Sequence, residues 1–116
     1  MMDLVEFFEN KVVIETLNLL SGKWKFQILR FLCENEGKRF SQIQQQLESI
    51  TPKMLSAELK ILEDNRLVTR KAFPTVPVTV EYKITEHGKT LKDIYGMILE
   101  WGRKHSENIK NGPPQG

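Results

Sequence analysis

The sequence predicts a mainly helical α+β domain with one small antiparallel sheet. Apolar residues recur every three or four positions over residues 13–34, 41–64 and 86–107, as in amphipathic helices. Residues 67–73 and 78–85 lie between the last two of these segments and are rich in β-branched and aromatic residues, as in paired strands. The chain has 116 residues, which is enough for a single core and therefore for one domain.

Two helices are expected before residue 35. The first lies within residues 1–20, and its apolar face is formed by Val13, Leu17 and Leu20. Ser21 and Gly22 interrupt it, and the Ser21 hydroxyl is expected to cap the second helix, over about residues 23–34. The second helix offers four apolar residues to the core: Trp24, Ile28, Leu29 and Leu32.

The one cysteine of the chain, Cys33, lies in the second helix, so no disulfide can form within the chain. Its neighbours Leu29 and Leu32 are expected to be buried. A cysteine in such surroundings usually behaves as a small apolar residue. We therefore expect a buried, unreactive thiol, and a redox role is the less favoured alternative.

A short strand at Arg39-Phe40 and a short helix are expected next. Ser41 is the predicted N-cap of this helix, because its hydroxyl could accept from the amide of Gln44 while the Gln44 side chain reaches back. Ile43 and Leu47 are four residues apart and would give the helix one apolar face.

The helix over residues 52–64 is expected to have one packed face and one free face. Thr51 as N-cap and Pro52 at the first helical position fix its start. The packed face is formed by Leu55, Leu59 and Leu62, and the free face by Lys53, Ser56, Ala57 and Lys60. The free face suits phosphates and base edges of DNA, although an ordinary solvated helix face would carry similar residues.

Residues 70–80 are predicted to form a wing, which is a hairpin whose loop projects from the domain. Pro74 and Pro77 enclose the loop. Since proline cannot donate a ladder hydrogen bond, we expect a stiff loop rather than a tight turn. Arg70 and Lys71 at its base are placed to meet a phosphate backbone or a minor groove. The alternative is that these charges protect an edge strand from aggregation.

The last helix, over residues 86–107, carries more apolar surface than one small domain is expected to cover. Its apolar residues recur at spacings of three and four: Leu91, Ile94, Tyr95, Ile98 and Trp101. Together with the helix within residues 1–20, this surface would be covered in a two-fold dimer, and folding back onto its own domain is the alternative. Residues 111–116 are Gly, Pro and polar residues and are expected to be disordered.

Positive charge is concentrated in the middle of the chain. Residues 21–73 hold ten cations against six anions, whereas residues 1–20 hold one cation against four anions. The net charge of the whole chain is only +2, so the distribution, rather than the total, favours a nucleic-acid partner.

The sequence offers little for catalysis or for membrane insertion. His87 and His105 have no cluster of further ligands, and no nucleophile with a base or phosphate-binding loop is recognisable. We therefore expect no metal, no cofactor and no enzymatic activity. No apolar stretch is long enough for a membrane span, and the start lacks the features of a secretory signal, so a cytoplasmic protein is expected.

Three segments of the chain resemble the HxlR-type group of winged helix-turn-helix transcription regulators, relatives of the MarR regulators. They are SGKWKFQIL (21–29), KRFSQIQQQLESITPKMLSAELKILEDNRLVTR (38–70) and FPTVPVTVEYKITEHGKTL (73–91). The order of the expected elements gives one winged-helix domain over residues 1–110, with the helix-turn-helix and wing at 41–84, and the resemblance agrees with it. The resemblance also implies a homodimer that binds double-stranded DNA through the helix over residues 52–64 and represses or activates nearby promoters.

The residues expected at these interfaces follow from the pattern and the resemblance together. Those expected to contact DNA are Arg39, Ser41, Thr51, Lys53, Met54, Ser56, Ala57, Lys60, Arg70, Lys71 and Thr75. Those expected in the dimer interface are Phe7, Phe8, Leu17, Leu91, Ile94, Tyr95, Ile98 and Trp101. A small-molecule effector is a further partner, expected between the dimerisation helices and the DNA-binding core. A protein-binding winged helix and a small-molecule sensor with secondary DNA binding are the alternative functions.

Two features depart from the group that the chain resembles. Members often carry a cysteine before the GKW motif, and several use it to sense oxidants or electrophiles, whereas this chain has Asn10-Lys11-Val12-Val13 there. That mechanism is therefore not carried over. Relatives also tend to have a basic residue before VEY, where this chain has Val78-Thr79. We expect this wing to grip DNA less strongly, which leaves more of the contact to Arg70, Lys71 and the helix over residues 52–64.

Overall fold

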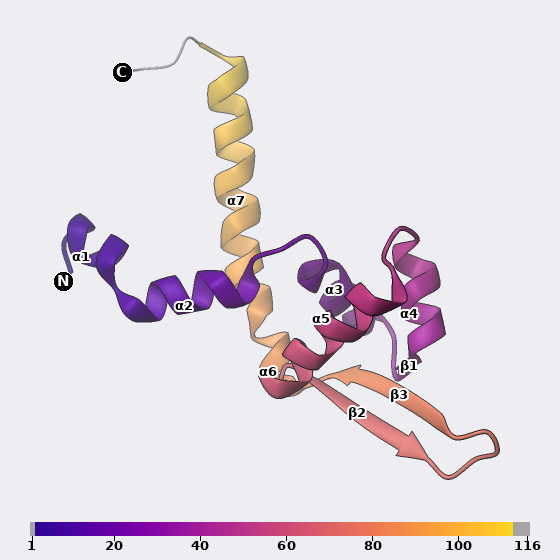
Figure 1. Cartoon of the computed structure of the whole chain (residues 1–116). Helices are drawn as coiled ribbons and strands as arrows, with labels where there is room; N and C mark the ends of the chain where they lie inside the picture. The colour runs from indigo at the N-terminus through magenta and orange to yellow at the C-terminus, as the bar shows by residue number, and fades with distance from the viewer. Residues whose placement is uncertain (1, 113–116) are drawn as a thin grey trace.

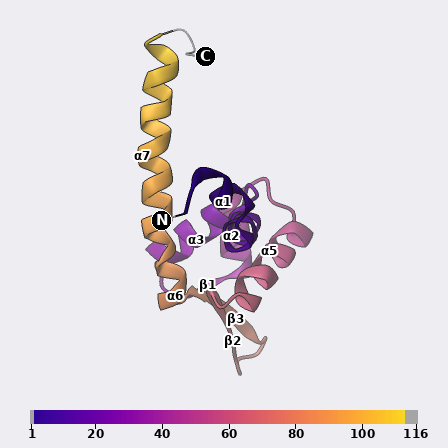
Figure 2. The same cartoon turned by 90° about the vertical axis from the view of Figure 1, so that its left-hand side faces the viewer.

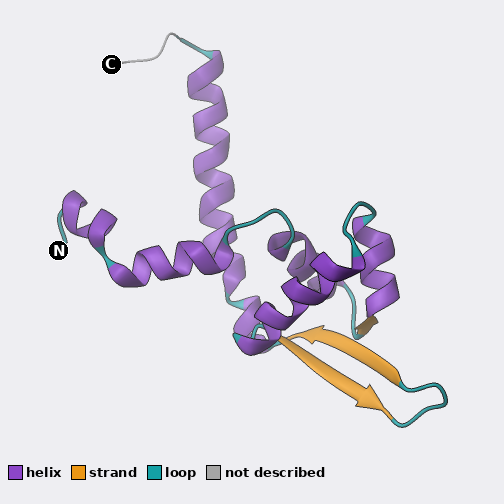
Figure 3. Ribbon diagram, viewed as in Figure 1, coloured by secondary structure: helices purple, strands orange, loops and turns teal. Residues whose placement is uncertain are grey.

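The computed structural model describes residues 2–112, and Figures 1 and 3 show a mainly helical chain with one small sheet. The elements in chain order are α1 (Leu4–Glu9), α2 (Lys11–Leu20), α3 (Lys25–Glu34), β1 (Lys38–Arg39), α4 (Phe40–Leu47), α5 (Pro52–Asp64), β2 (Val68–Phe73), β3 (Thr79–Ile84), α6 (Glu86–Lys89) and α7 (Leu91–Lys110). This order confirms the predicted mainly helical winged helix-turn-helix. Of the tail expected to be disordered, residues 113–116 lie outside the described residues.

The sheet has three antiparallel strands in the order β1-β3-β2. β2 and β3 form a hairpin whose pairing runs from Val68↔Ile84 to Phe73↔Thr79. β1 adds only two pairs to the other side of β3, and it lies one residue earlier than predicted because Phe40 already belongs to α4. β2 is therefore an outer strand with one side free.

The core is formed where α3, α4, α5 and the base of the hairpin meet. Its buried apolar residues are Trp24, Ile28, Leu29, Leu32, Ile43, Leu47, Ile50, Leu55, Leu59, Leu62, Leu67, Val68 and Leu91. The predicted apolar faces of α4 and α5 are thus confirmed. Because three successive turns of α5 are held in this core, its opposite side is fixed toward solvent.

α4 begins differently from the prediction. Arg39 is its N-cap residue, and the Arg39 amide donates to Oε1 of Gln42 at 2.9 Å. Ser41 lies inside the first turn, and Gln44 donates instead to the carbonyl of Ile50 at 3.5 Å. The predicted Ser41 cap is therefore wrong. α4 starts earlier because Phe40 packs against the core, and this contact with a distant part of the chain cannot be seen in the local sequence.

The N-terminal helices also differ from the prediction. Asn10 divides the first helix in two, since its side-chain oxygen accepts from the amides of Val12 and Val13 at 3.0 and 3.3 Å. Ser21 does not cap α3, because its hydroxyl donates to the carbonyl of Asn18 at 2.8 Å and so helps to end α2. Gly22 then turns the chain with a φ of +102°.

The two ends of the chain project from the core. Figures 1 and 2 show α7 rising as a single rod from the domain, and Figure 1 shows α1 and α2 extending to one side. The principal extents are 63 × 32 × 24 Å, which is elongated for a chain of this length. α1 and α2 contain no buried residue, and Leu91 is the one buried residue of α7.

Candidate nucleic-acid interface

The start of α5 is fixed by its own side chains, as predicted. The Thr51 hydroxyl accepts from the amide of Met54 at 3.1 Å, and Pro52 opens the helix. The orphan amides of a helix N-terminus carry partial positive charge, which favours anions near this end. Residues 52–57 include no carboxylate, and the first acid of the helix, Glu58, turns inward. The N-terminal half of α5 is thus an exposed, electropositive surface.

The predicted free face of α5 is exposed in the structure. Lys53, Ser56, Ala57 and Lys60 are all exposed, and so is Met54 at the first turn. Lys60 is partly neutralised, because its ammonium lies 3.0 Å from a carboxylate oxygen of Asp64. The hydrogen bond to Asp64 and the nearby negative charge raise the pKa of Lys60, which therefore stays cationic. Among the described residues Lys53 has no such ion pair, so it is the freer cation of this face.

An ion pair that the sequence analysis missed anchors the inner side of α5. Nζ of Lys25 in α3 lies 3.0 Å from Oε2 of Glu58, and the two side chains are only 10% and 21% exposed. The same ammonium donates to the carbonyl of Ser21 at 3.3 Å. A signal for this pair was present in the sequence, because each residue lies within the apolar stripe of its helix, three positions before Ile28 and three after Leu55.

The end of α5 is closed by a Schellman motif. The amide of Arg66 donates to the carbonyl of Glu63 and that of Leu67 to the carbonyl of Leu62, both at 2.9 Å. Arg66 has a φ of +60°, the left-handed conformation that this motif requires. Leu67 is then buried, and the chain turns directly into β2. The wing is therefore rigidly attached to the end of α5.

The wing consists of β2, β3 and the loop between them, and Figure 1 shows it projecting from the domain. Arg70 and Lys71 are exposed on the outer strand β2, as expected, and the Lys71 ammonium lies 5.0 Å from the centre of the Phe73 ring. Thr75 was expected to contact DNA, but its hydroxyl donates to the carbonyl of Pro77 at 2.7 Å and lies 2.8 Å from Oγ1 of Thr79. These bonds shape the loop, so we assign that hydroxyl to holding the loop rather than to a partner.

Three further features bear on the expected DNA-contacting residues. Arg39 in β1 and Ser41 in the first turn of α4 are both exposed, although Ser41 does not cap its helix. Thr51 is exposed as well, but its hydroxyl is engaged in capping α5. Val76 at the wing tip is fully exposed and was not singled out from the sequence. The sequence feature that could have identified Val76 is its position between the two loop prolines, where an apolar side chain is expected to stay exposed.

The expected dimer residues are exposed with two exceptions. Phe7, Phe8, Leu17, Ile94, Ile98 and Trp101 are exposed large apolar residues. Leu91 is only 9% exposed and belongs to the core of its own chain, so it has little surface to offer a second copy. The reason is that α7 begins inside the domain and leaves it only after its first turn. Tyr95 is half buried, with its ring edge-on to Phe26 at 4.6 Å between centroids.

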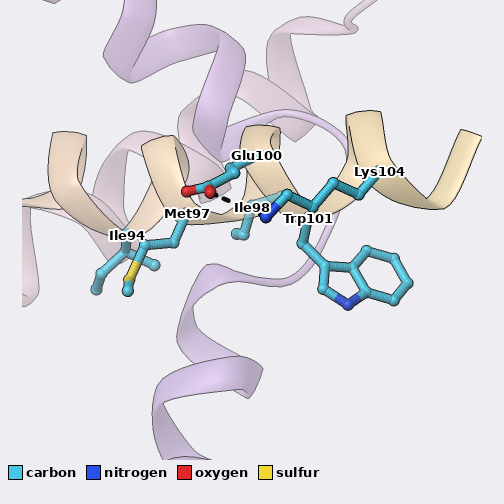
Figure 4. Close-up of a pocket in the computed structure, with 6 residues that line it drawn as sticks. All are labelled: Ile94, Met97, Ile98, Glu100, Trp101 and Lys104. Carbon is cyan, nitrogen blue, oxygen red and sulfur yellow. Dashed lines mark hydrogen bonds and ion pairs between the residues drawn. The ribbon is translucent and has the colours of Figure 1, made fainter. Parts of the chain in front are cut away.

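An open apolar groove runs along the projecting part of α7. Figure 4 shows Ile94, Met97, Ile98 and Trp101 along the helix, with the ion pair between Glu100 and Lys104, 3.3 Å apart, beside them. The groove has a volume of about 530 Å³. This hollow lies in a surface that the chain itself leaves uncovered.

Cys33 is exposed, which corrects the expected buried thiol. It follows Leu32 by one residue, and a step of about 100° around the helix carries it off the buried stripe of α3. Two other properties concern the described residues 2–112 as a whole. None of their helices has the length and apolar character needed to cross a membrane. No three of their His, Cys, Asp or Glu side chains gather in a way that could hold a metal ion.

Known proteins share this sequence and fold. A family model described as HxlR-like helix-turn-helix matches residues 19–110. The HTH-type transcriptional regulator BH0655 of Halalkalibacterium halodurans, itself uncharacterised, is 44% identical over 93 residues, which cover 80% of this chain and 82% of that protein. The uncharacterised HTH-type transcriptional regulator YdeP of Bacillus subtilis is 35% identical over 102 residues, covering 88% of this chain and 79% of that protein.

Solved structures agree with the family match. The reduced form of the transcriptional regulator YodB from B. subtilis has a TM-score of 0.75 and 29% identity, and the match covers 97% of this chain and 100% of that one. The redox regulator HypR in its reduced form has a TM-score of 0.74 and 33% identity, covering 88% of this chain and 100% of that one. The chain therefore belongs to the HxlR-like helix-turn-helix family, and it is a winged-helix transcriptional regulator rather than an enzyme.

Proposed function

We propose that this regulator binds specific double-stranded DNA sequences as a homodimer, with α5 in the major groove and wing residues 70–80 on the backbone or in the minor groove. The observation that carries the proposal is the division of α5 into a core face and an exposed face that bears Lys53, Ser56, Ala57 and Lys60. The N-terminal residues of such a helix are the ones that reach base edges in helix-turn-helix proteins. This face is polar and cationic, which favours DNA over a protein partner.

The wing supplies a second contact in this arrangement. Arg70 and Lys71 on the outer strand suit phosphates, which fix the register of a protein on DNA without reading sequence. Val76 at the tip is an exposed apolar side chain, and proteins that bind the minor groove often insert apolar side chains between base steps. Because the Schellman motif connects β2 directly to α5, the DNA-contacting surfaces of the helix and of the wing should move together.

A homodimer explains the exposed apolar residues of the chain ends. α1 and α2 contain no buried residue, although Leu19 and Leu20 at the end of α2 pack against the core, and α7 buries only Leu91 among its own residues. A two-fold axis through these helices would cover the groove at Ile98 and Trp101 with the same surface of a second copy. It would also present two α5 helices to half-sites about 34–36 Å apart, one turn of DNA. Binding to chromosomal DNA would place the protein in the cytoplasm.

Gel-shift titration on the DNA upstream of the protein's own gene, at two salt concentrations, tests DNA binding. Affinity should fall steeply with salt, because lysines displace counterions from phosphates. Lys53→Ala should weaken binding about tenfold, whereas Lys110→Ala, which removes the same charge at the far end of α7, should not. Binding that is absent at low salt, or is equally affected by both substitutions, would contradict the assigned face.

The mass of the particle in solution tests the dimer. Wild-type protein should sediment as a dimer, and Ile98→Asp should give folded monomers, because it places a charge in the apolar groove of α7. The same variant should bind a two-half-site operator far more weakly. Ser106→Asp, a charge change on an exposed residue of the same helix, is the control. A wild-type monomer would exclude the proposed assembly.

A further inference from the structure

The exposed face of α5 is not uniform, because one of its edges is apolar. Met54, Ala57 and Ile61 are all exposed, with Met54 at 42% and Ile61 at 37%. They are three and four residues apart, so at about 100° per residue they fall within about 60° of one another. These three residues form a continuous surface, which we call the apolar row. By the same geometry Ser56 and Lys60 lie on the other edge of the face.

Both ends of the apolar row are held by hydrogen bonds. The amide of Met54 donates to the Thr51 hydroxyl at 3.1 Å. The carbonyl of Ile61 accepts from Nδ2 of Asn65 at 2.8 Å and from the Asn65 amide at 3.1 Å. These bonds, together with the leucines that α5 buries in the core, fix the direction in which the row faces. The row is therefore a preformed surface, and the flexible Met54 side chain can adapt its shape to a partner.

The charges beside the apolar row favour DNA as its partner. Lys53 and Lys60 are exposed along one side of it, and residues 52–57 include no carboxylate. Arg70 and Lys71 add positive charge on the wing, which Figure 1 shows extending from the end of α5. A matching partner is an anion that also carries apolar groups at its surface. In the major groove of DNA, phosphates and the C5-methyl groups of thymine supply this combination.

The spacing along the row suits neighbouring base pairs. Met54 and Ala57 are separated by about 4.5 Å along the helix axis, from a rise of about 1.5 Å per residue. Successive base pairs are about 3.4 Å apart. An α-helix fits in the major groove, and its N-terminal residues reach the base edges there. Met54 and Ala57 can therefore meet two thymines in succession, while Ile61 lies farther from the helix start and extends the apolar contact outward.

We propose that the apolar row determines part of the operator sequence, with Met54 and Ala57 against the methyl groups of two neighbouring thymines in each half-site. The inference rests on the proposed function and adds to it the base that one edge of α5 selects. Another base at these positions would present either no methyl group or a hydrogen-bonding group without a partner to the row, and affinity would fall.

Selection of the full-length protein on duplex DNA with a randomised segment is the first step of the test. The enriched half-sites should contain two thymines in succession on one strand. If no sequence is enriched at low salt, DNA binding itself has failed, and the proposed function falls with it. Enriched half-sites that lack neighbouring thymines would overturn the assignment of the apolar row alone.

Uracil substitution then isolates the methyl groups. Replacing one of these thymines with deoxyuridine removes the methyl group and leaves the hydrogen-bonding edge of the base unchanged. Binding of the wild-type protein, measured by fluorescence anisotropy, should weaken about fourfold at each of the two positions, the value of burying one methyl-sized group. Uracil in place of a thymine outside the half-sites is the control and should change nothing.

Two variants of α5 locate the contact. Met54→Gln keeps the length and helix propensity of the side chain but makes its end polar, so uracil at the matching position should no longer weaken binding further. Ser56→Ala, on the other edge of the same face, should leave the effect of uracil intact. Neither substitution changes a charge, so both variants should keep the salt dependence of the wild type, which reports on the phosphate contacts.

Two results would overturn the proposal while leaving DNA binding in place. The first is a wild-type protein that binds the thymine and uracil half-sites equally, which would leave the apolar row to a protein partner. The second is an effect of uracil that persists unchanged at both positions in Met54→Gln, which would place the methyl groups against other residues.

Discussion

Breaking the ion pair between Lys25 and Glu58 should destabilise the domain strongly. The two groups lie 3.0 Å apart, and Glu58→Gln would leave the ammonium of Lys25 with neutral acceptors and no negative charge, in a position that is 8% exposed. Removing one partner of a fully buried pair costs about 3–5 kcal/mol, whereas an exposed pair contributes about 0–1 kcal/mol. The Glu58 side chain is 21% exposed, so this pair is not fully buried. We therefore expect the free energy of unfolding to fall by about 2–3 kcal/mol.

The complementary substitution should cost less. Lys25→Met keeps the apolar stem in the core, and the Glu58 carboxylate can turn toward water, so we expect a loss of about 1–2 kcal/mol. The double variant has no unpaired charge and should recover much of the loss. The losses of the two single variants should therefore not add, which is the mark of a direct interaction.

Urea denaturation followed by tryptophan fluorescence measures these effects, with Trp24 next to the substituted lysine. The protein concentration must stay fixed, since the proposed dimerisation would make the midpoint depend on it. Glu36→Gln is the matched control, because it breaks an exposed pair with Lys83 at a similar distance, 2.9 Å, and should leave the midpoint unchanged. The pair would not hold α5 in place if Glu58→Gln lowered the free energy of unfolding no more than this control did. The same would follow if the losses of the two single variants were additive.

Three further predictions concern single positions. Gly88→Ala should lower stability by about 1–3 kcal/mol in the same denaturation assay, because its methyl group would overlap the Leu67 carbonyl; an unchanged midpoint would refute this close approach. Asp64→Asn should free Lys60 for phosphate and tighten DNA binding with a steeper salt dependence in the gel shift, and identical salt slopes would disprove it. Burial raises the pKa of the Tyr95 hydroxyl, so phenolate absorbance should show a component above the usual range that Tyr95→Phe removes; stability from this group is present at lower pH and is lost as pH rises through the raised pKa.

The proposed DNA-binding helix could be located from sequence because its determinants are local. Thr51 and Pro52 fix where α5 starts, and three leucines at helical spacing decide which side is buried. Both follow from backbone geometry and need no knowledge of the rest of the fold. The wing was predictable for a similar reason, since the two prolines interrupt the ladder between two β-rich segments.

The features that could not be predicted depend on contacts between distant segments. Phe40 packs on the core and moves the start of α4 away from Ser41. Leu91 is buried because α7 starts inside the domain, although its spacing matches that of the exposed residues after it. A helical wheel places Cys33 just off the buried stripe of α3, but that α7 leaves it exposed instead of covering it depends on a contact between distant segments.

The length of α7 has a consequence for the life of the protein in the cell. Its 20 residues span about 30 Å, and beyond the first turn most of them lack support from the rest of the chain. Because most helical stability in proteins comes from tertiary packing, the unsupported part of α7 should open often enough for proteases to cut it. In the proposed dimer another copy covers this helix, so a newly made subunit should be short-lived until it assembles. Turnover would remove subunits at low abundance and spare assembled ones, so the amount of intact regulator should rise more steeply than its rate of synthesis.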